Sequence, residues 1–143
     1  MAVRMADDPT DRPAARDSDP GEAVRALFTL GYHLEASEAH YEGAASSYTE
    51  ALQLAEQAGD LPSQVELHAA LAQLAVYRAD WPEVERATDA SAALAEREGL
   101  LGKLCFPYVM RGVLGWRDGR WDDSAETCRR AYELAEQVGR SEV

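Results

Sequence analysis

Apolar residues recur with a helical period along most of the chain. In the first such segment, Ala26, Leu27, Leu30 and Leu34 are separated by one, three and four residues, which is the spacing of one helix face. Similar spacing continues to about residue 138, and no stretch alternates apolar and polar residues as a half-buried strand would. We therefore expect an all-α fold without a sheet.

One sequence unit occurs three times with an offset of 40 residues and no gap. It consists of a Leu-Ala-Glu tripeptide, a glycine after it and an aromatic residue before it. The copies begin at Leu54, Leu94 and Leu134, with glycines at Gly59, Gly99 and Gly139 and aromatic residues at Tyr41, Trp81 and Trp121. This period predicts an α-solenoid of three antiparallel helix pairs, six helices in all, with units at residues 21–60, 61–100 and 101–140.

Aspartate, proline and glycine mark the expected helix ends. Asp19 followed by Pro20 is a typical helix start, and each of the three glycines is expected to end the second helix of its unit. Pro107 lies near the start of the first helix of the third unit, where proline costs little. We therefore expect regular helix over about 106–116, with 101–105 forming a looser turn or a kinked extension.

The last helix is expected to run from Trp121 to Val138. Its expected inward residues are Ala125, Cys128, Ala131, Tyr132 and Ala135. The sequence stops five residues after Val138, so the surface around Tyr132, Leu134 and Val138 is expected to lack a neighbour. The chain is then either part of a longer array, or this surface pairs with another copy or a partner, which makes a homo-oligomer possible.

Residues 1–20 differ in composition from the rest of the chain. They contain three prolines and five aspartates but almost no large apolar residues. Such a segment buries too little apolar surface to offset the entropy lost on ordering. We expect a disordered tail at 1–20 and one helical repeat domain at 21–143.

The overall charge restricts the class of partner. The formal net charge is −12, which opposes general binding to nucleic acid or to anionic membrane. No apolar run approaches the roughly 20 residues needed to span a bilayer, and the N-terminus lacks the pattern of a secretory signal. We expect a cytoplasmic protein. Thirteen arginines against the single Lys103 are common in proteins from high-GC bacterial genomes.

Motifs for catalysis or cofactor binding are absent from the sequence. There is no phosphate loop, no GxGxxG, no HExxH and no Cys-x-x-Cys. None of His33, His40 and His68 has a second ligand at metal-binding spacing. Cys105 and Cys128 are expected to be reduced, part-buried small residues. We expect a protein that is not an enzyme and has no metal or cofactor.

The second helices resemble those of tetratricopeptide (TPR) repeats, which carry a small, a bulky and another small residue at steps of four and three. Ala44, Tyr48 and Ala51 match this pattern; Ser124, Cys128 and Ala131 match moderately, and Val84, Thr88 and Ser91 loosely. The period of 40 differs from the 34 of that family, and glycine replaces its closing proline. Repeats of this long type are similar to the sensor and scaffold regions of bacterial signal-responsive transcriptional activators.

The resemblance implies that the first helix of each pair lines a concave, partner-binding face. The implied groove residues are Tyr32 and His33, then Glu66, Ala69, Gln73, Val76 and Tyr77, then Phe106, Val109, Val113, Trp116 and Arg117. Tyr32, Tyr77, Trp116 and Arg117 are the strongest candidates, because aromatic and arginine side chains are the usual anchors of interfaces. For Trp116 and Phe106, packing against a neighbouring helix is an equally good interpretation.

Three functions remain open at this point. The first is a non-enzymatic, regulatory module that binds a protein or peptide segment on its concave face. The second is a small-molecule sensor whose superhelix encloses a ligand. The third is a structural segment of a larger regulator that self-associates through the uncapped C-terminal helix.

Overall fold

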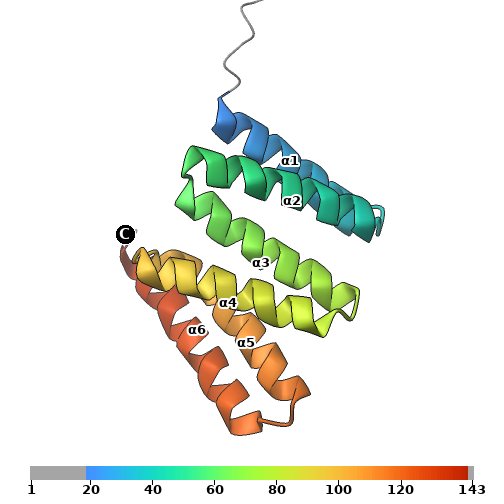
Figure 1. Ribbon diagram of the computed structural model, residues 1–143. Coiled ribbons are helices and arrows are strands. Elements are labelled where there is room, and N and C mark those ends of the chain that lie inside the picture. The colour runs from blue at the N-terminus through green and yellow to red at the C-terminus, as the bar shows by residue number, and fades with distance from the viewer. Residues whose placement is uncertain (1–18, 142–143) are drawn as a thin grey trace, which may run out of the picture.

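The computed structural model describes residues 19–141, and within them the chain is built from helices (Figure 1). The elements are α1 (Pro20–Ala36), α2 (Tyr41–Ala58), α3 (Leu61–Tyr77), α4 (Trp81–Arg97), the 3-10 helix η1 (Leu101–Lys103), α5 (Cys105–Arg117) and α6 (Trp121–Ser141). No strand occurs in the described residues, so the predicted all-α fold is confirmed. The predicted disordered tail lies outside this range, apart from Asp19 and Pro20.

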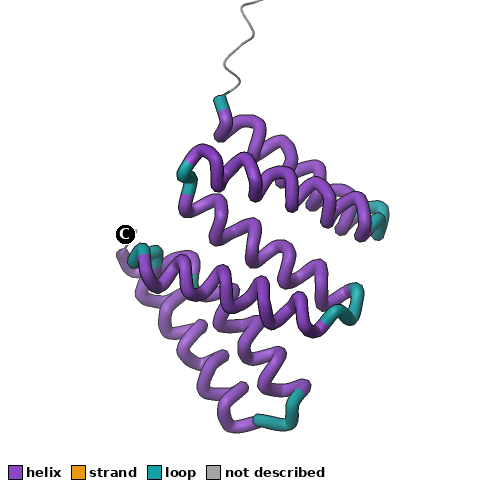
Figure 2. Tube along the Cα trace, in the orientation of Figure 1, coloured by secondary structure: helices purple, strands orange, loops and turns teal. Residues whose placement is uncertain are grey.

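The six helices form three antiparallel pairs that stack in chain order. Figure 1 shows α1–α2 at the top, α3–α4 below it and α5–α6 at the bottom, and Figure 2 shows the short loops between them. Each pair packs on the next, chiefly through α2 with α3 and α4 with α5. This is the α-solenoid of three helix pairs that the 40-residue period predicts.

The hydrophobic core is shared between neighbouring pairs. Val24 of α1 and Tyr48 of α2 belong to one buried cluster with Leu67 of the following pair. In the next cluster, Val65 of α3 packs with Tyr108 of α5. Each such side chain stabilises the fold by about 1.5–3 kcal/mol when fully buried. A single pair cannot bury its apolar face alone, which is why the pairs stack.

Aspartate side chains cap three of the helices. The carboxylate of Asp19 accepts the N–H of Gly21 at 2.9 Å, and Asp60 accepts the N–H of Ser63 at 3.1 Å. Asp80 caps α4 in the same way, and in all three helices a proline follows at the first or second position. The helix start predicted at Asp19 and Pro20 is therefore confirmed.

Two of the three repeat glycines end a helix, and the third does not. Gly59 and Gly99 both have φ of 66°, the left-handed conformation that favours glycine. The turn at Gly59 lets the N–H of Asp60 reach the carbonyl of Ala55 at 2.9 Å. The prediction that Gly139 ends α6 was wrong, because α6 continues through it to the end of the described residues. No described element follows Gly139 that would require a turn there.

The first helix of the third unit begins as its proline predicts. The 3-10 helix η1 precedes α5, and Pro107 lies buried in the first turn of α5. In that turn the missing N–H of proline leaves no helical hydrogen bond unmade. The expected helix over 106–116 is thus confirmed, with one more residue at each end.

The first unit has a different register from the other two. Four residues (37–40) join α1 to α2, whereas three (78–80) join α3 to α4. Equivalent positions of α1 and α3 are consequently 41 residues apart, although the second helices keep the offset of 40. Gly31, Ala72 and Gly112 are equivalent in this register, and all three are buried.

Most of the predicted inward face of α6 is exposed. Of the five residues expected to point inward, only Ala131 is buried. The other four are Ala125, Cys128, Tyr132 and Ala135. In α2 and α4, the first helix of the next pair buries the equivalent face, and the prediction for α6 assumed the same burial. Within the described residues, no further helix covers α6.

Candidate binding groove

The first helices form a shared face with two adjoining hollows. One hollow of about 160 Å³ lies between α3 and α5, and its lining comprises Gln73, Val76, Tyr77, Phe106, Met110 and Val113. The second, of about 220 Å³, reaches α1 and is lined by Phe28, Glu66, Ala69, Ala70, Gln73 and Phe106. Because Gln73 and Phe106 line both, the hollows form one continuous depression, which we name the α3–α5 groove.

The α5 side of the groove is apolar and open to solvent. Phe106, Val109, Val113 and Trp116 are spaced by three and four residues and therefore share one face of α5. Val109 keeps 42% of its surface exposed and Trp116 keeps 61%. Exposed large apolar side chains that lie together mark interaction sites more often than scattered ones do.

Three of the predicted site residues meet in the groove. Gln73 and Tyr77 come from successive turns of α3, and Val113 faces them from α5. Nε2 of Gln73 donates to Oη of Tyr77 at 3.3 Å, so a polar edge accompanies the apolar floor. Tyr77 also stacks on Tyr41 of α2, with ring centroids 5.8 Å apart. That stacking fixes one ring face of Tyr77 and leaves the residue 54% exposed.

Tyr32 and His33 lie apart from the two hollows, near the C-terminal end of α1. Tyr32 occupies the α1 position equivalent to Gln73 and is 61% exposed. His33 is equivalent to the buried Leu74 and lies 3.2 Å from the Glu38 carboxylate through Nε2. The register of 41 makes Tyr32 the counterpart of Gln73 and removes the structural equivalence assumed for His33, but neither Tyr32 nor His33 lines the two hollows.

Trp116 and Arg117 contact the aromatic residues that open the second helices. The Trp116 ring meets Trp121 edge to face at 6.4 Å, and the Arg117 guanidinium lies 4.6 Å from the centre of the Trp81 ring. Arg117 on Trp81 repeats the contact of Tyr77 on Tyr41 one unit later. These contacts pack the end of α5 against the starts of α4 and α6, so Arg117 has a structural role whether or not it also binds a partner.

Phe28 and Met110 line the groove but were not identified from the sequence. Phe28 is equivalent to the candidate Ala69 only when the offset of 41 is applied. Its ring also packs on Tyr48, with centroids 5.5 Å apart. Phe28 could be identified only by allowing for the additional residue in the turn between α1 and α2. Met110 is buried, and its apolar character alone gave no indication of the groove.

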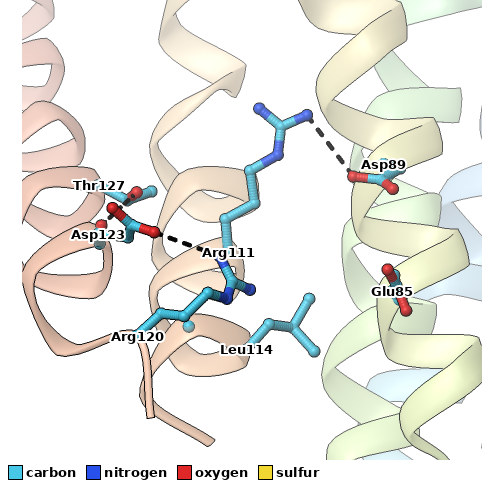
Figure 3. Close-up of a pocket in the computed structure, with 8 residues that line it drawn as sticks. Glu85, Asp89, Arg111, Leu114, Arg120, Asp123 and Thr127 are labelled. Carbon is cyan, nitrogen blue, oxygen red and sulfur yellow. Dashed lines mark hydrogen bonds and ion pairs between the residues drawn. The ribbon is translucent and has the colours of Figure 1, made fainter. Parts of the chain in front are cut away.

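A charged cleft lies where α5 meets α4 and α6 (Figure 3). It has a volume of about 200 Å³, and its charged residues are Glu85, Asp89, Arg111, Arg120 and Asp123. Arg111 lies 3.6 Å from Asp89, and Arg120 lies 3.7 Å from Asp123. Since both guanidinium groups already face carboxylates, neither is available to bind an anionic ligand.

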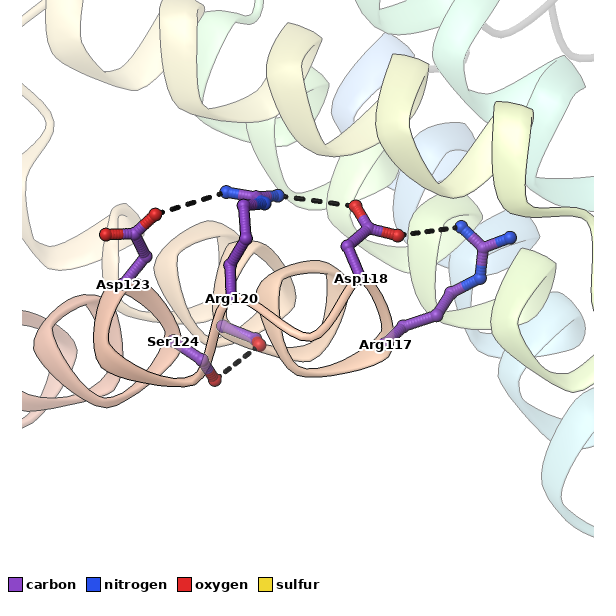
Figure 4. A network of polar contacts seen from close by, with 6 residues as sticks. Arg117, Asp118, Arg120, Asp123 and Ser124 are labelled. Carbon is purple, nitrogen blue, oxygen red and sulfur yellow. Dashed lines mark hydrogen bonds and ion pairs between the residues drawn. The ribbon is translucent and has the colours of Figure 1, made fainter.

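The turn between α5 and α6 is held by a chain of ion pairs (Figure 4). Asp118 accepts from Arg117 at 3.3 Å and from Arg120 at 3.4 Å. The Ser124 hydroxyl donates to the Gly112 carbonyl at 2.7 Å and ties the start of α6 to α5. Exposed ion pairs of this kind contribute about 0–1 kcal/mol each. The network is thus best understood as fastening this turn rather than as a site.

The described residues hold no group of three His, Cys, Asp or Glu side chains that could bind a metal ion. Cys105 is half-buried, Cys128 is exposed, and both are free thiols. None of the helices in the described part is long and apolar enough to cross a membrane. The groove is therefore the strongest candidate for a functional surface.

Comparison of the chain with protein families, with curated proteins and with solved structures gave no match. A functional hypothesis therefore rests on the sequence pattern and on the groove itself.

Proposed function

We propose that the chain is a non-enzymatic protein-interaction module of regulatory role that binds a segment of a partner protein in the α3–α5 groove. The observation that carries this proposal is the solvent-exposed apolar strip of α5, which faces Gln73 and Tyr77 of α3. The arrangement agrees with the resemblance to tetratricopeptide repeats, in which the first helices form the binding face.

The groove chemistry favours a partner segment with apolar side chains. Phe106, Met110 and Val113 offer an apolar floor, while Gln73 offers an amide at its edge. Glu66 and Lys103 form an ion pair beside the second hollow, so the rim is polar. An apolar centre with a polar rim is the usual organisation of a protein interface.

The openness of the groove to solvent favours a protein segment over a small molecule. Val109 and Trp116 on its α5 side keep 42% and 61% of their surface exposed, whereas small-molecule sites usually enclose most of their ligand. The net charge of −12 argues against nucleic acid and anionic membrane as partners. A cytoplasmic location in a bacterial cell is part of the same proposal.

Quantitative affinity capture tests the proposal. Lysate from the source cells is passed over the immobilised full chain, over Val113→Glu, and over Ala93→Glu, which places the same charge on the exposed surface of α4. A carboxylate in the apolar groove is costly to desolvate, so we expect Val113→Glu to weaken binding at least about tenfold.

The control Ala93→Glu is expected to retain wild-type binding, and circular dichroism establishes that both variants are folded. Equal capture of the same partner by all three proteins contradicts the groove assignment.

A further inference from the structure

One face of α6 is exposed where the equivalent face of α4 is buried. The equivalent pairs, 40 residues apart, are Thr88 and Cys128, Ala92 and Tyr132, and Ala95 and Ala135. All three α4 residues have no exposed surface, whereas Tyr132 of α6 is 64% exposed. We name Cys128, Tyr132 and Ala135 the α6 stripe.

The junction between α4 and α5 shows how such a face is covered. Ala95 of α4 packs in one cluster with Leu104 and Tyr108. At the edge of the covered face, Arg111 of α5 lies 3.6 Å from Asp89 and 3.4 Å from Glu96. A covering helix thus buries the apolar positions and also neutralises the two charges that flank them.

The flanking charges of α6 have opposite signs. Arg129 and Glu136 occupy the positions equivalent to Asp89 and Glu96, one turn before and one turn after Tyr132. Within α6, Arg129 pairs with Glu126, while Glu136 accepts the Tyr132 hydroxyl at 3.0 Å and lies 3.7 Å from Arg140. No single charged residue of a covering helix could neutralise both.

A second α6 running antiparallel supplies the matching charges. A two-fold axis that passes beside Tyr132, perpendicular to both helices, makes the two copies of α6 antiparallel. It also keeps Arg129 and Glu136 of both copies on the same side of the helix pair. Arg129 then lies beside Glu136 of the partner copy, and Glu136 lies beside Arg129 of the partner copy. Because the surface is self-complementary in this way, it suits an isologous dimer.

The outer face of α1 is a poorer complement to the α6 stripe. If the chain stacked head to tail, α1 would cover α6 as α3 covers α2. The α3 residues that fill that junction, Leu67 and Leu74, are replaced in α1 by Ala26 and His33. With an alanine and a histidine in place of two leucines, a head-to-tail junction would bury much less apolar surface than the junction between α2 and α3 does.

We propose that α6 is the interface of a homodimer, in which the α6 stripe packs antiparallel against that of a second copy. Tyr132 lies at the two-fold axis, and the Arg129–Glu136 pairs lie on either side of it. This inference is independent of the proposed groove function, because the α6 stripe and the groove share no residue.

Sedimentation equilibrium of the full chain over micromolar to submillimolar concentrations tests the dimer. We expect a concentration-dependent approach to twice the chain mass. Tyr132→Glu should remain monomeric at the same concentrations, while Tyr32→Glu, which alters a tyrosine of similar exposure on α1, should dimerise normally. A wild-type monomer throughout, or growth beyond the dimer as in head-to-tail stacking, overturns the proposal.

Charge reversal tests the pairing. Arg129→Glu and Glu136→Arg each place like charges side by side, so each variant alone should dimerise at least about tenfold more weakly. Mixing the two variants restores opposite charges and should restore association, as should the double variant alone. Association unaffected by either reversal, or no recovery on mixing, contradicts the predicted pairs.

Disulfide trapping tests the direction of the helices in a background with Cys105→Ala and Cys128→Ala. Tyr132→Cys should cross-link two copies, because these positions meet at the axis. Ala125→Cys should not, because seven residues on either side of the axis separate its two copies by about 20 Å, well beyond the roughly 7 Å limit between Cα atoms. Efficient cross-linking through position 125 would indicate a parallel pair and overturn the proposal.

Discussion

Small residues at one position of each first helix determine how closely the two helices of a pair approach. A β-carbon at Gly31 would lie 2.6 Å from Cε1 of Tyr48, and one at Gly112 would lie 2.4 Å from Sγ of Cys128. Tyr48 cannot move aside easily, because it is buried and its hydroxyl donates to Glu35 at 2.7 Å. Glycine at position 31 is therefore required by packing rather than by backbone conformation.

Gly31→Ala should leave the protein less stable than Gly139→Ala does. Both replace a helical glycine, so both gain about 1 kcal/mol of helix propensity. Only Gly31→Ala crowds a neighbour, since the space around Gly139 is open, and overpacking costs about 1–3 kcal/mol. We expect Gly31→Ala to be less stable than Gly139→Ala by about that amount in urea unfolding; equal stabilities would refute the packing role of Gly31.

The surroundings of His68 determine which protonation state of its imidazole the folded protein favours. Burial lowers the pKa of its imidazole below the ordinary value of 6.5, and the charge of Arg86 lowers it further against the opposing effect of Glu56 and Glu83. Its Nδ1 is buried and has no hydrogen-bond partner among the described residues. The folded protein therefore favours the neutral imidazole.

The stability of the protein should decrease as the pH falls below about 6.5. In that range the unfolded chain binds a proton at His68 more readily than the folded chain does, so acid favours unfolding. The contribution is fully present above pH 6.5 and is lost towards the lowered pKa of the folded state. Replacing the imidazole by His68→Gln should flatten this part of the pH profile of urea unfolding; an unchanged slope contradicts the predicted role.

At the scale of the helix, most boundaries could be predicted because their signals are local. The start at Asp19 and Pro20 and the glycine at Gly59 act within one turn of the helix they begin or end. The end at Gly139 and the inward face of α6 were predicted wrongly. Both depend on whether another helix covers α6, which the sequence of α6 does not encode.

Removing a cap should destabilise the protein by an amount typical of helix starts. In Asp60→Ala, the hydrogen bonds from the N–H of Ser63 at 3.1 Å and from its hydroxyl at 2.6 Å are both lost. We expect a loss of about 1 kcal/mol in the free energy of unfolding. Asp60→Asn retains an acceptor and should stay close to wild type in thermal or urea unfolding. Equal losses in both variants would point to a role of the negative charge instead.

At the scale of the whole molecule, the period of 40 residues was sufficient to predict the stacked helix pairs. It was insufficient to predict the groove completely, because one additional residue in the turn between α1 and α2 shifts every position of α1. Gln73, Tyr77 and Val113, which were predicted as groove residues, line one hollow together, whereas Phe28, which lines the other hollow, was not among the predicted residues. The identity of a partner depends on a molecule outside the chain, and its prediction needs experiment.

Site-specific photo-crosslinking tests most directly whether the α3–α5 groove binds a partner. Val109, exposed beside the groove on α5, is replaced by benzoylphenylalanine, and Ala93 on the exposed surface of α4 receives the same group as control. In source cells we expect one discrete cross-linked partner from position 109, lost when Val113→Glu is added, and none from position 93. Equal cross-linking from both positions, or a product at 109 that persists with Val113→Glu, would contradict the proposed groove.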